Sequence, residues 1–366
     1  MKVSVHIILS VVFFIGVVNF AGAQNAIPNA GKATASAAAQ ISHVDSAQFA
    51  KESFVLSNGI KGLLVTIPTR NPVDYAPLIA GDVGKPVSIT GQLFLPAHSN
   101  GRVPAVIENP GSGNLGPHHL AHAAALTSVG IAVLVIDPFF ARSIDNTMVD
   151  QFGQITWASS AYDVLAAIQF LRARPDIDGQ RIGATGGSRG GTAVLMAATA
   201  PLSDAVLGAG KGLRAVVAGY PWCGTQFQSA KLTKGVALLT LSGDKDDWVS
   251  FLQCQDATHA MQVAGQNAVI KLFPGARHAF DRADTPPTAI PQAVTSTIYP
   301  TVYMDNKGIY YNMRTGALDP TLTPQYFLDY SIKGGFLHRG VTVGSEGTQA
   351  GEFEQEMVDF FKEHLL

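Results

Sequence analysis

The chain has 366 residues, of which 47% are hydrophobic and 14% are charged, and its formal net charge at pH 7 is −2. This composition predicts a folded protein with one large core or two domains, and it excludes an intrinsically disordered chain. It also argues against a nucleic-acid partner, because that partner requires a basic surface and the sequence contains nothing that resembles one.

The first 23 residues are typical of a secretory signal peptide. Lys2 precedes an apolar run over residues 3–20, and Ala21-Gly22-Ala23 provides a small-residue cleavage site. The alternative is a membrane anchor, although the run barely reaches the length that spans a bilayer. No cysteine follows the run, so a lipid anchor is not expected. We expect a mature chain that starts near Gln24, is secreted or periplasmic, and has no membrane association after cleavage.

Residues 24–50 are rich in Ala, Ser, Gln and Asn without a period, which predicts a flexible leader or an arm laid on the surface. Residues 51–366 are expected to form the folded domain. Extended segments at 62–67 and 87–96 come first, and apolar strands then alternate with helices. The predicted strands are residues 105–108, 131–136, 182–185, 215–220, 236–241 and 268–273. The predicted helices are residues 120–129, 155–173, 192–200, 248–263 and 351–365. This order predicts an α/β fold with a doubly wound, mostly parallel sheet.

A Gly-x-Ser-x-Gly motif lies between the predicted strand 182–185 and the predicted helix 192–200. Its serine is Ser188, and its outer residues are Gly186 and Gly190. In this context the motif predicts the nucleophile elbow of an α/β-hydrolase fold, where the hydroxyl is exposed above the sheet. Glycines are needed there because a Cβ would collide where strand and helix approach. The serine also needs a base, which is usually a histidine held by a carboxylate.

An acid and a histidine follow the serine in the order that this fold uses. Asp244, Asp246 and Asp247 come after the predicted strand 236–241, and His278 comes after the predicted strand 268–273. His278 is the candidate base. Asp246 is the preferred acid, because it can turn back toward the sheet, whereas Asp247 is expected to cap the helix that begins at Trp248. Asp247 and then Asp244 are the alternatives for the acid.

Acyl transfer also requires backbone N–H groups that stabilise the oxyanion. One is expected from Arg189, directly after the nucleophile. The other is expected from the glycine-rich loop at residues 109–113. Pro110 has no N–H group, so Gly111 or Ser112 must donate, and Ser112 is preferred. The alternative is that this loop is simply a tight turn.

The chain has two cysteines. Cys223 follows the predicted strand 215–220, and Cys254 lies in the helix that follows the next strand. In a parallel sheet these connections emerge at the same edge, so the two thiols can meet. Two cysteines in an oxidising compartment favour one disulfide bond. The alternative is a pair of buried free thiols.

Residues 281–348 separate the last predicted strand from the last helix and contain six of the nine tyrosines. A loop of this length predicts a lid or a pocket wall, and the alternative is a structured decoration. It starts at the catalytic edge of the sheet, so Tyr303 and Tyr310 are predicted to contact substrate. Arg142, in a loop at the same edge, is predicted either to hold an acidic substrate or to form a structural ion pair.

Three histidines, His118, His119 and His122, begin the helix after the glycine-rich loop. His118 and His122 have the spacing of a metal-binding pair. No carboxylate or cysteine completes a set nearby, so we predict no metal site and expect these side chains to line the mouth of the cleft.

Four motifs resemble the serine-bearing members of the dienelactone hydrolase family. They are Gly-Gly-Ser188-Arg-Gly-Gly, Tyr-Pro-Trp-Cys223, Gly-Asp-Lys-Asp246-Asp-Trp and Pro-Gly-Ala-Arg-His278-Ala-Phe. The resemblance covers about residues 85–281 and the last helix. It implies an α/β-hydrolase fold, hydrolysis of ester or lactone bonds, and Ser188, Asp246 and His278 as the catalytic triad. The chain departs from the dienelactone hydrolases of that family, which use a cysteine nucleophile with a glutamate in the preceding loop. It has a serine, and Glu108 does not lie at the matching place.

The sequence therefore predicts an exported single-domain serine esterase that acts on a small-molecule ester through an acyl-enzyme and needs no cofactor. One alternative is a peptidase of the prolyl-oligopeptidase type, although no β-propeller or gating domain precedes the catalytic region. The other is a catalytically silent hydrolase fold used for binding. The sequence does not predict the oligomeric state.

Overall fold

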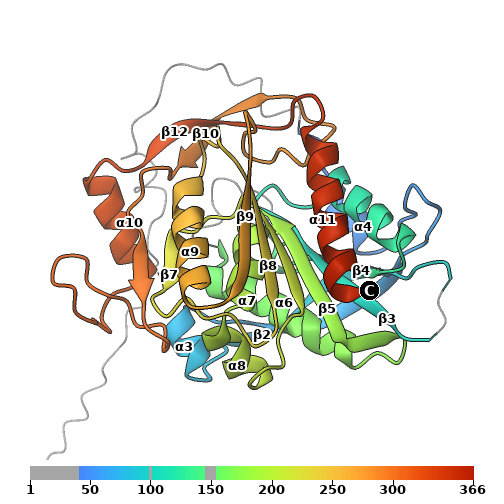
Figure 1. Cartoon of the computed structure of the whole chain (residues 1–366), viewed down its shortest axis with the longest axis horizontal. Helices are drawn as coiled ribbons and strands as arrows, with labels where there is room; N and C mark the ends of the chain where they lie inside the picture. The colour runs from blue at the N-terminus through green and yellow to red at the C-terminus, as the bar shows by residue number, and fades with distance from the viewer. Residues whose placement is uncertain (1–40, 99–100, 145–153) are drawn as a thin grey trace, which may run out of the picture.

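The computed structural model describes residues 41–98, 101–144 and 154–366. The predicted signal peptide and most of the predicted leader lie outside these ranges. The centre of the described chain is an eight-stranded sheet (Figure 1) with the strand order β1-β2-β4-β3-β5-β6-β8-β9. Its strands are β1 (Leu63–Asn71), β2 (Lys85–Phe94), β3 (Val103–Asn109), β4 (Ala132–Asp137), β5 (Ile177–Gly187), β6 (Ala215–Gly219), β8 (Ala237–Gly243) and β9 (Asn267–Phe273).

Two layers of helices cover this sheet (Figure 1). One face carries α4 and α11, and the other carries α6, α7 and α9. The helices and helical turns are α2 (Ser46–Phe49), α3 (Tyr75–Ile79), α4 (Pro117–Ser128), η2 (Phe140–Arg142), α6 (Trp157–Arg172), α7 (Arg189–Ala197), α8 (Ala200–Leu207), α9 (Phe251–Val263), α10 (Pro324–Lys333) and α11 (Gln349–Leu365). The doubly wound α/β arrangement that the sequence predicts is confirmed.

Most strands of the sheet are parallel, and their burial agrees with this direction. Strands β3, β4, β6 and β8 are buried along their whole length, as parallel strands between two helix layers must be. From β4 to β9 each neighbouring pair is parallel, whereas β1 and β2 join as antiparallel strands. The carboxyl ends of the parallel strands therefore share one edge, where ligand sites of open α/β sheets form.

The segment 281–348 is folded rather than a structureless loop. β10 (Thr288–Thr295) pairs antiparallel with β12 (His338–Val343), and β11 (Val302–Met304) pairs parallel with the short strand β7 (Thr225–Phe227). Helix α10 lies between β11 and β12 in the sequence. The β10–β12 pair and α10 lie at the periphery of the molecule, beside α9 and the carboxyl edge of the sheet (Figure 1). Hydrogen bonds and apolar contacts, described below, join this insertion to the rest of the chain.

The end of the predicted flexible leader is ordered. Asp45 caps α2 through its side chain, Phe49 is fully buried, and the N–H of Val44 donates to the carbonyl of Leu115. Ile41 belongs to an apolar cluster with residues of β10 and β12. The folded part of the chain therefore begins before residue 51, because apolar side chains within residues 41–50 are buried against the rest of the domain.

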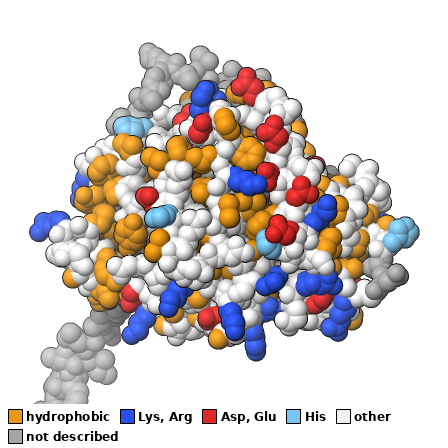
Figure 2. Space-filling view, viewed as in Figure 1, with side chains coloured by type: hydrophobic (Ala, Val, Ile, Leu, Met, Phe, Trp, Pro, Cys, Tyr) orange, Lys and Arg blue, Asp and Glu red, His pale blue; other side chains and the backbone are white. Residues whose placement is uncertain are grey.

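Hydrophobic side chains gather over the α9 and α10 side of the face in Figure 2, while Lys and Arg lie mainly along its lower edge. Exposed hydrophobic residues of α9, α10 and the insertion include Leu252, Val263, Ile298, Tyr326 and Tyr330. No helix within the described ranges is both long enough and apolar enough to cross a lipid bilayer.

Candidate active site

Ser188 lies at the sharp turn between β5 and α7. Its backbone has φ 56° and ψ −121°, a conformation that residues with a Cβ rarely adopt. The turn is held because the N–H of Ser188 donates to the carbonyl of Gly219 at 2.9 Å. A Cβ on Gly190 would collide with the carbonyl oxygen of Asn109. This close approach explains the glycines of the motif and leaves the Ser188 side chain partly exposed at the carboxyl edge.

A chain of hydrogen bonds joins the serine to His278 and Asp246. The Oγ of Ser188 lies 2.9 Å from Nε2 of His278, and Nδ1 of His278 lies 2.8 Å from Oδ2 of Asp246. A neutral imidazole protonated on Nδ1 satisfies both contacts, because Nδ1–H then donates to the carboxylate and Nε2 accepts the serine proton. The imidazole and the carboxyl group are both buried, so water does not compete for the bond between them.

Asp246 is held by its second carboxylate oxygen. Oδ1 accepts hydrogen bonds from the N–H groups of Trp248 and Val249 at 2.9 and 3.0 Å. These bonds form a turn where the sequence predicts the start of a helix, so α9 begins at Phe251. Asp247 does not cap that helix, and the prediction of this role is wrong: its Oδ1 accepts the N–H of Thr342 at 2.9 Å.

Two aromatic rings enclose the imidazole of His278. The ring of Tyr220 meets it edge-on and the indole of Trp248 lies against it, each with a centroid distance of 4.8 Å. The hydroxyl of Tyr220 donates to Oδ1 of Asp281 at 2.6 Å, which fixes that ring. Burial, together with the charge of Asp281, raises the pKa of Tyr220 well above its usual value, so this ring stays a neutral hydrogen-bond donor.

The glycine-rich loop packs directly against the nucleophile. A Cβ built on Gly111 would lie 3.2 Å from Cβ of Ser188 and 2.8 Å from the carbonyl oxygen of Gly187. Helix α7 starts at Arg189, and the first N–H groups of a helix have no acceptor within it. The loop and the helix start thus flank Ser188, but which N–H groups bind an oxyanion, including that of Ser112, stays a prediction.

Of the two predicted roles of Arg142, the structure shows the structural ion pair. Its Nη1 and Nη2 each lie 2.8 Å from a carboxylate oxygen of the buried Asp163, and its Nε donates to Oδ1 of Asn71. Burial raises the pKa of Asp163, and the adjacent guanidinium opposes that shift. The pair ties η2 to α6, which leaves no support for substrate binding by Arg142.

The two tyrosines selected from the sequence differ from each other in exposure. Tyr310 is buried, donates a hydrogen bond of 3.0 Å to Asp74 and packs against Phe327. It therefore fastens the insertion to α3. Tyr303 is 41% exposed on β11. Contact of either ring with substrate stays a prediction that these positions do not favour.

Cys223 and Cys254 form the predicted disulfide bond. It joins the connection after β6 to helix α9, across a sequence separation of 31 residues. By restricting the unfolded chain, closing a loop of this size stabilises the fold by roughly 2–4 kcal/mol.

An aromatic platform, made of Trp157, Trp222 and Tyr299, lies beside the elbow, and the sequence did not predict that these three rings pack together. Trp157 and Trp222 stack at 4.9 Å, and Trp222 meets Tyr299 edge-on at 5.7 Å. Thr192 of α7 links this platform to the nucleophile, because its hydroxyl lies within hydrogen-bonding distance of the carbonyls of Ser188 and Trp222 and accepts the N–H of Trp222. The position of Trp222 at the carboxyl end of β6 is the signal that could have identified it.

Below the platform, the guanidinium of Arg189 lies 4.1 Å from the centre of the Trp157 ring. Its side chain is buried and donates to the hydroxyl of Ser160 at 3.3 Å. The side chain of Arg189, the first residue of α7, thus supports the platform. This role is independent of the predicted role of its backbone N–H in binding an oxyanion.

The predicted cleft-mouth histidines are instead buried, and that prediction is wrong. His118, His119 and His122 are each less than 10% exposed. Helix α4 packs against α11 in the same layer, and His122 stacks on Phe353 with a centroid distance of 5.6 Å. Nδ1 of His122 lies 3.6 Å from Oε2 of Glu108, which is also buried. Among the described residues no set of three or more His, Cys, Asp or Glu side chains is arranged to hold a metal ion.

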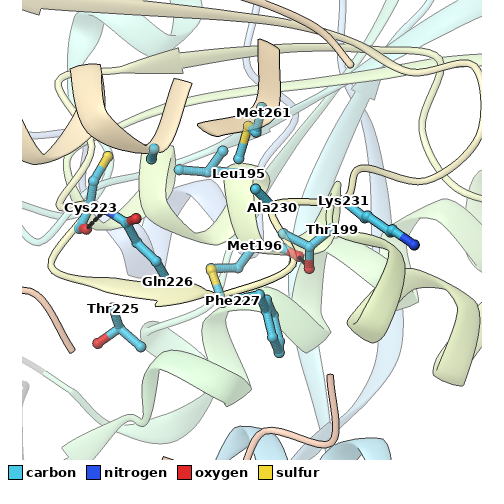
Figure 3. Close-up of a pocket in the computed structure, with 11 residues that line it drawn as sticks. Leu195, Met196, Thr199, Cys223, Thr225, Gln226, Phe227, Ala230, Lys231 and Met261 are labelled. Atoms are coloured by element: carbon cyan, nitrogen blue, oxygen red, sulfur yellow. Dashed lines mark hydrogen bonds between the residues drawn. The ribbon is translucent and has the colours of Figure 1, made fainter. Parts of the chain in front are cut away.

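The crevice in Figure 3 lies between α7, β7 and α9. Its lining consists of Leu195, Met196, Thr199, Cys223, Thr225, Gln226, Phe227, Ala230, Lys231, Ala257 and Met261. Ser188, Asp246 and His278 are not part of this lining. The crevice is therefore separate from the catalytic edge.

Comparisons with known proteins agree with this geometry. The model of the dienelactone hydrolase family matches residues 96–302. No curated protein matches the sequence significantly. Among solved structures, a dienelactone hydrolase from Anabaena variabilis is 17% identical, with a TM-score of 0.50 over 84% of this chain and 99% of that protein. A dienelactone hydrolase-like promiscuous phosphotriesterase from metagenomic libraries is 16% identical, with a TM-score of 0.51 over 83% of this chain and 99% of that one. These likenesses show an α/β-hydrolase fold.

Proposed function

Because the chain belongs to the dienelactone hydrolase family, we propose that it is a serine hydrolase that cleaves carboxylic ester or lactone bonds through an acyl-enzyme. The observation that carries this proposal is the continuous contact from Ser188 Oγ to His278 Nε2 at 2.9 Å and from His278 Nδ1 to Asp246 Oδ2 at 2.8 Å. A serine is a weak nucleophile alone, and this arrangement gives it a base that is oriented by a carboxylate.

In the proposed reaction, Ser188 Oγ attacks the ester carbonyl carbon while His278 Nε2 accepts the hydroxyl proton. The carbonyl π electrons move to oxygen and give a tetrahedral oxyanion. When the carbonyl re-forms, the ester C–O bond breaks and the imidazolium returns the proton to the leaving alkoxide, which departs as the alcohol. Water then attacks the acyl-enzyme with His278 again as base, which releases the acid and restores the serine. Asp246 stabilises the imidazolium in both halves.

We assign oxyanion stabilisation to the N–H of Arg189 together with that of Gly111 or Ser112. The support is positional: α7 begins directly after Ser188, and Gly111 packs against the nucleophile. Donors fixed before the reaction contribute strongly, because they need not reorganise as the charge develops. The reaction requires no cofactor.

We also propose that the protein is exported to the periplasm or the medium. The disulfide bond between Cys223 and Cys254 supports this location, since such bonds persist in oxidising compartments. The predicted signal peptide, which lies outside the described residues, supports it as well.

The first prediction concerns the nucleophile and base. Ser188→Ala and His278→Ala should each lower kcat on p-nitrophenyl acetate on the order of 10⁴-fold or more, and the double variant should lose little further, because the members act as a unit. A serine-reactive phosphonate should label Ser188 in the parent. Peptide mass spectrometry that found the label on another serine would contradict the assignment.

The same substrate panel separates the alternatives. A peptidase of the prolyl-oligopeptidase type would cleave a proline-containing peptide in preference to the ester. A silent fold used for binding would cleave neither and would resist the phosphonate. An ester hydrolase would cleave the ester and would depend on Ser188 for doing so.

A further inference from the structure

The insertion contacts both loops that carry the histidine and the acid. Strand β12 forms a parallel bridge at Val343 with His278, and the N–H of Gly344 donates to the carbonyl of His278 at 2.9 Å. The residue before Val343 also contributes a bond: the N–H of Thr342 donates to Oδ1 of Asp247 at 2.9 Å. Asp247 adjoins Asp246, which bonds His278. The contacts therefore form a closed ring through β12, the histidine loop and the acid loop.

Apolar packing reinforces this ring. The indole of Trp248 contacts the imidazole of His278. It also packs against the apolar cluster of Ile41, Ile290, Ala293, Val341 and Val343. The carbonyl of Trp248 also accepts the N–H of Ser296, just after β10, at 2.8 Å. The acid loop is thus bonded to β12 and to the residue that directly follows β10.

From this ring we infer that Asp247 and β12 act as positioning elements, which hold the acid loop and the histidine loop at a fixed separation. This inference rests on the proposed catalytic roles of Ser188, His278 and Asp246. Catalytic groups must be held close to their productive geometry, and a misplacement on the order of 1 Å can cost about 100-fold in rate. Asp247 is next to the acid and bonded to the strand that holds the base, so it transmits the position of one to the other.

The chemistry of the bond provides a discriminating substitution. Asp247 acts here as a hydrogen-bond acceptor for a backbone N–H, and the side-chain carbonyl of asparagine can accept the same bond. Asp247→Asn should therefore keep the ring closed, whereas Asp247→Ala opens it. If the negative charge were what mattered, the two variants would lose equal activity. Asp256→Ala is the matched control, because it removes an exposed carboxylate from neighbouring α9.

The experiment measures kcat and KM on p-nitrophenyl acetate, the rate of phosphonate labelling of Ser188, and Tm, for the full chain. For Asp247→Ala we expect kcat and the labelling rate to fall together by roughly 10- to 100-fold, with KM within about twofold of the parent. Asp247→Asn should stay within about threefold of the parent in both rates, and so should Asp256→Ala.

A second variant keeps the test informative. Thr342→Pro removes the donor of the same hydrogen bond, and the double variant Asp247→Ala/Thr342→Pro should be no slower than the slower single variant, because both remove one interaction. Independent, multiplicative losses would overturn the inference. So would an Asp247→Ala enzyme whose Tm falls while kcat per folded molecule is unchanged, or an asparagine variant as slow as the alanine one. Failure of the parent to be labelled at Ser188 would instead contradict the proposed function.

Discussion

At the scale of single residues, the elbow shows how strongly one glycine, Gly190, constrains the site. Ser188 keeps a strained backbone because the surrounding contacts hold it: its N–H is bonded to Gly219, and Gly190 lets the glycine-rich loop approach to van der Waals distance. In this conformation the Oγ of Ser188 lies 2.9 Å from Nε2 of His278. The same closeness leaves no room for any larger residue at position 190.

Gly190→Ala should therefore destabilise the fold by about 1–3 kcal/mol or more, because the new Cβ would overlap the backbone oxygen of Asn109, which cannot move away as a flexible side chain could. Urea unfolding measures the change. Gly351→Ala in α11 is the matched control: its Cβ would meet nothing within 4 Å, and alanine favours the helix by about 0.5–1 kcal/mol. Equal stability of the two variants would show that the elbow tolerates a side chain.

The sequence was sufficient to locate Ser188 and His278, because chain order and the ends of apolar strands place them at one edge. It ranked Asp246 first, but it could not show why the neighbouring Asp247 has another role. The partner of Asp247 is Thr342, which is 95 positions away and in a segment without a strong strand pattern. A hydrogen bond between such distant residues has no local signal in the sequence.

At the scale of elements, apolar runs predicted the six parallel strands of the eight-stranded sheet and the main helices. The residues at which helices begin and end depended instead on polar contacts. The predicted helix 248–263 begins at Phe251, because Asp246 holds the preceding turn. The predicted helix 192–200 ends at Ala197, and a separate helix α8 follows from Ala200. Strands β10, β11 and β12 were not predicted, since none of them is a continuous apolar run and each pairs with a segment that is distant in the sequence.

The aromatic platform beside the nucleophile is predicted to affect substrate choice. Trp222 is tied to α7 by Thr192, and Tyr299 of the insertion packs on its ring. Trp222→Ala should lower the ratio of kcat/KM for an aryl ester over a short alkyl ester by several-fold to about tenfold, since aromatic pairs contribute roughly 0.5–1.5 kcal/mol beyond area burial. Tyr303→Ala, at an exposed ring, should leave that ratio unchanged. An equal fall for both esters in Trp222→Ala would mean that the platform only supports the fold.

At the scale of the whole molecule, segments distant in sequence converge around one buried polar cluster beneath α11. It combines Glu108 of β3, His122 of α4 and Asp281 after β9, and the neighbouring Arg282 donates a hydrogen bond to the carbonyl of Ser42. Composition predicts a mostly apolar core and gave no sign of this cluster. It forms because the two helices of one layer and the leader all close over the same end of the sheet.

This cluster sets a pH dependence of stability. Burial lowers the pKa of His122, but the carboxylate of Glu108 and the charge of Asp281 outweigh it, so the pKa is raised from the ordinary value of 6.5 to about 8. The folded chain therefore holds this proton more tightly than the unfolded chain does. The resulting stabilisation is fully present below about pH 6.5 and is lost as the pH rises through about 8.

We accordingly expect the free energy of unfolding of the parent to fall between pH 6 and pH 9.5 by an amount on the order of 1–2 kcal/mol from this group. His122→Gln cannot titrate, so its unfolding free energy should change less over the same range even though the variant is less stable throughout. His338→Ala, at an exposed position of β12, should keep the slope of the parent. Urea unfolding at the two pH values measures all three. A slope in His122→Gln as steep as that of the parent would assign the pH dependence to other groups, because the buried pair would then hold the same charge in the folded and unfolded chains.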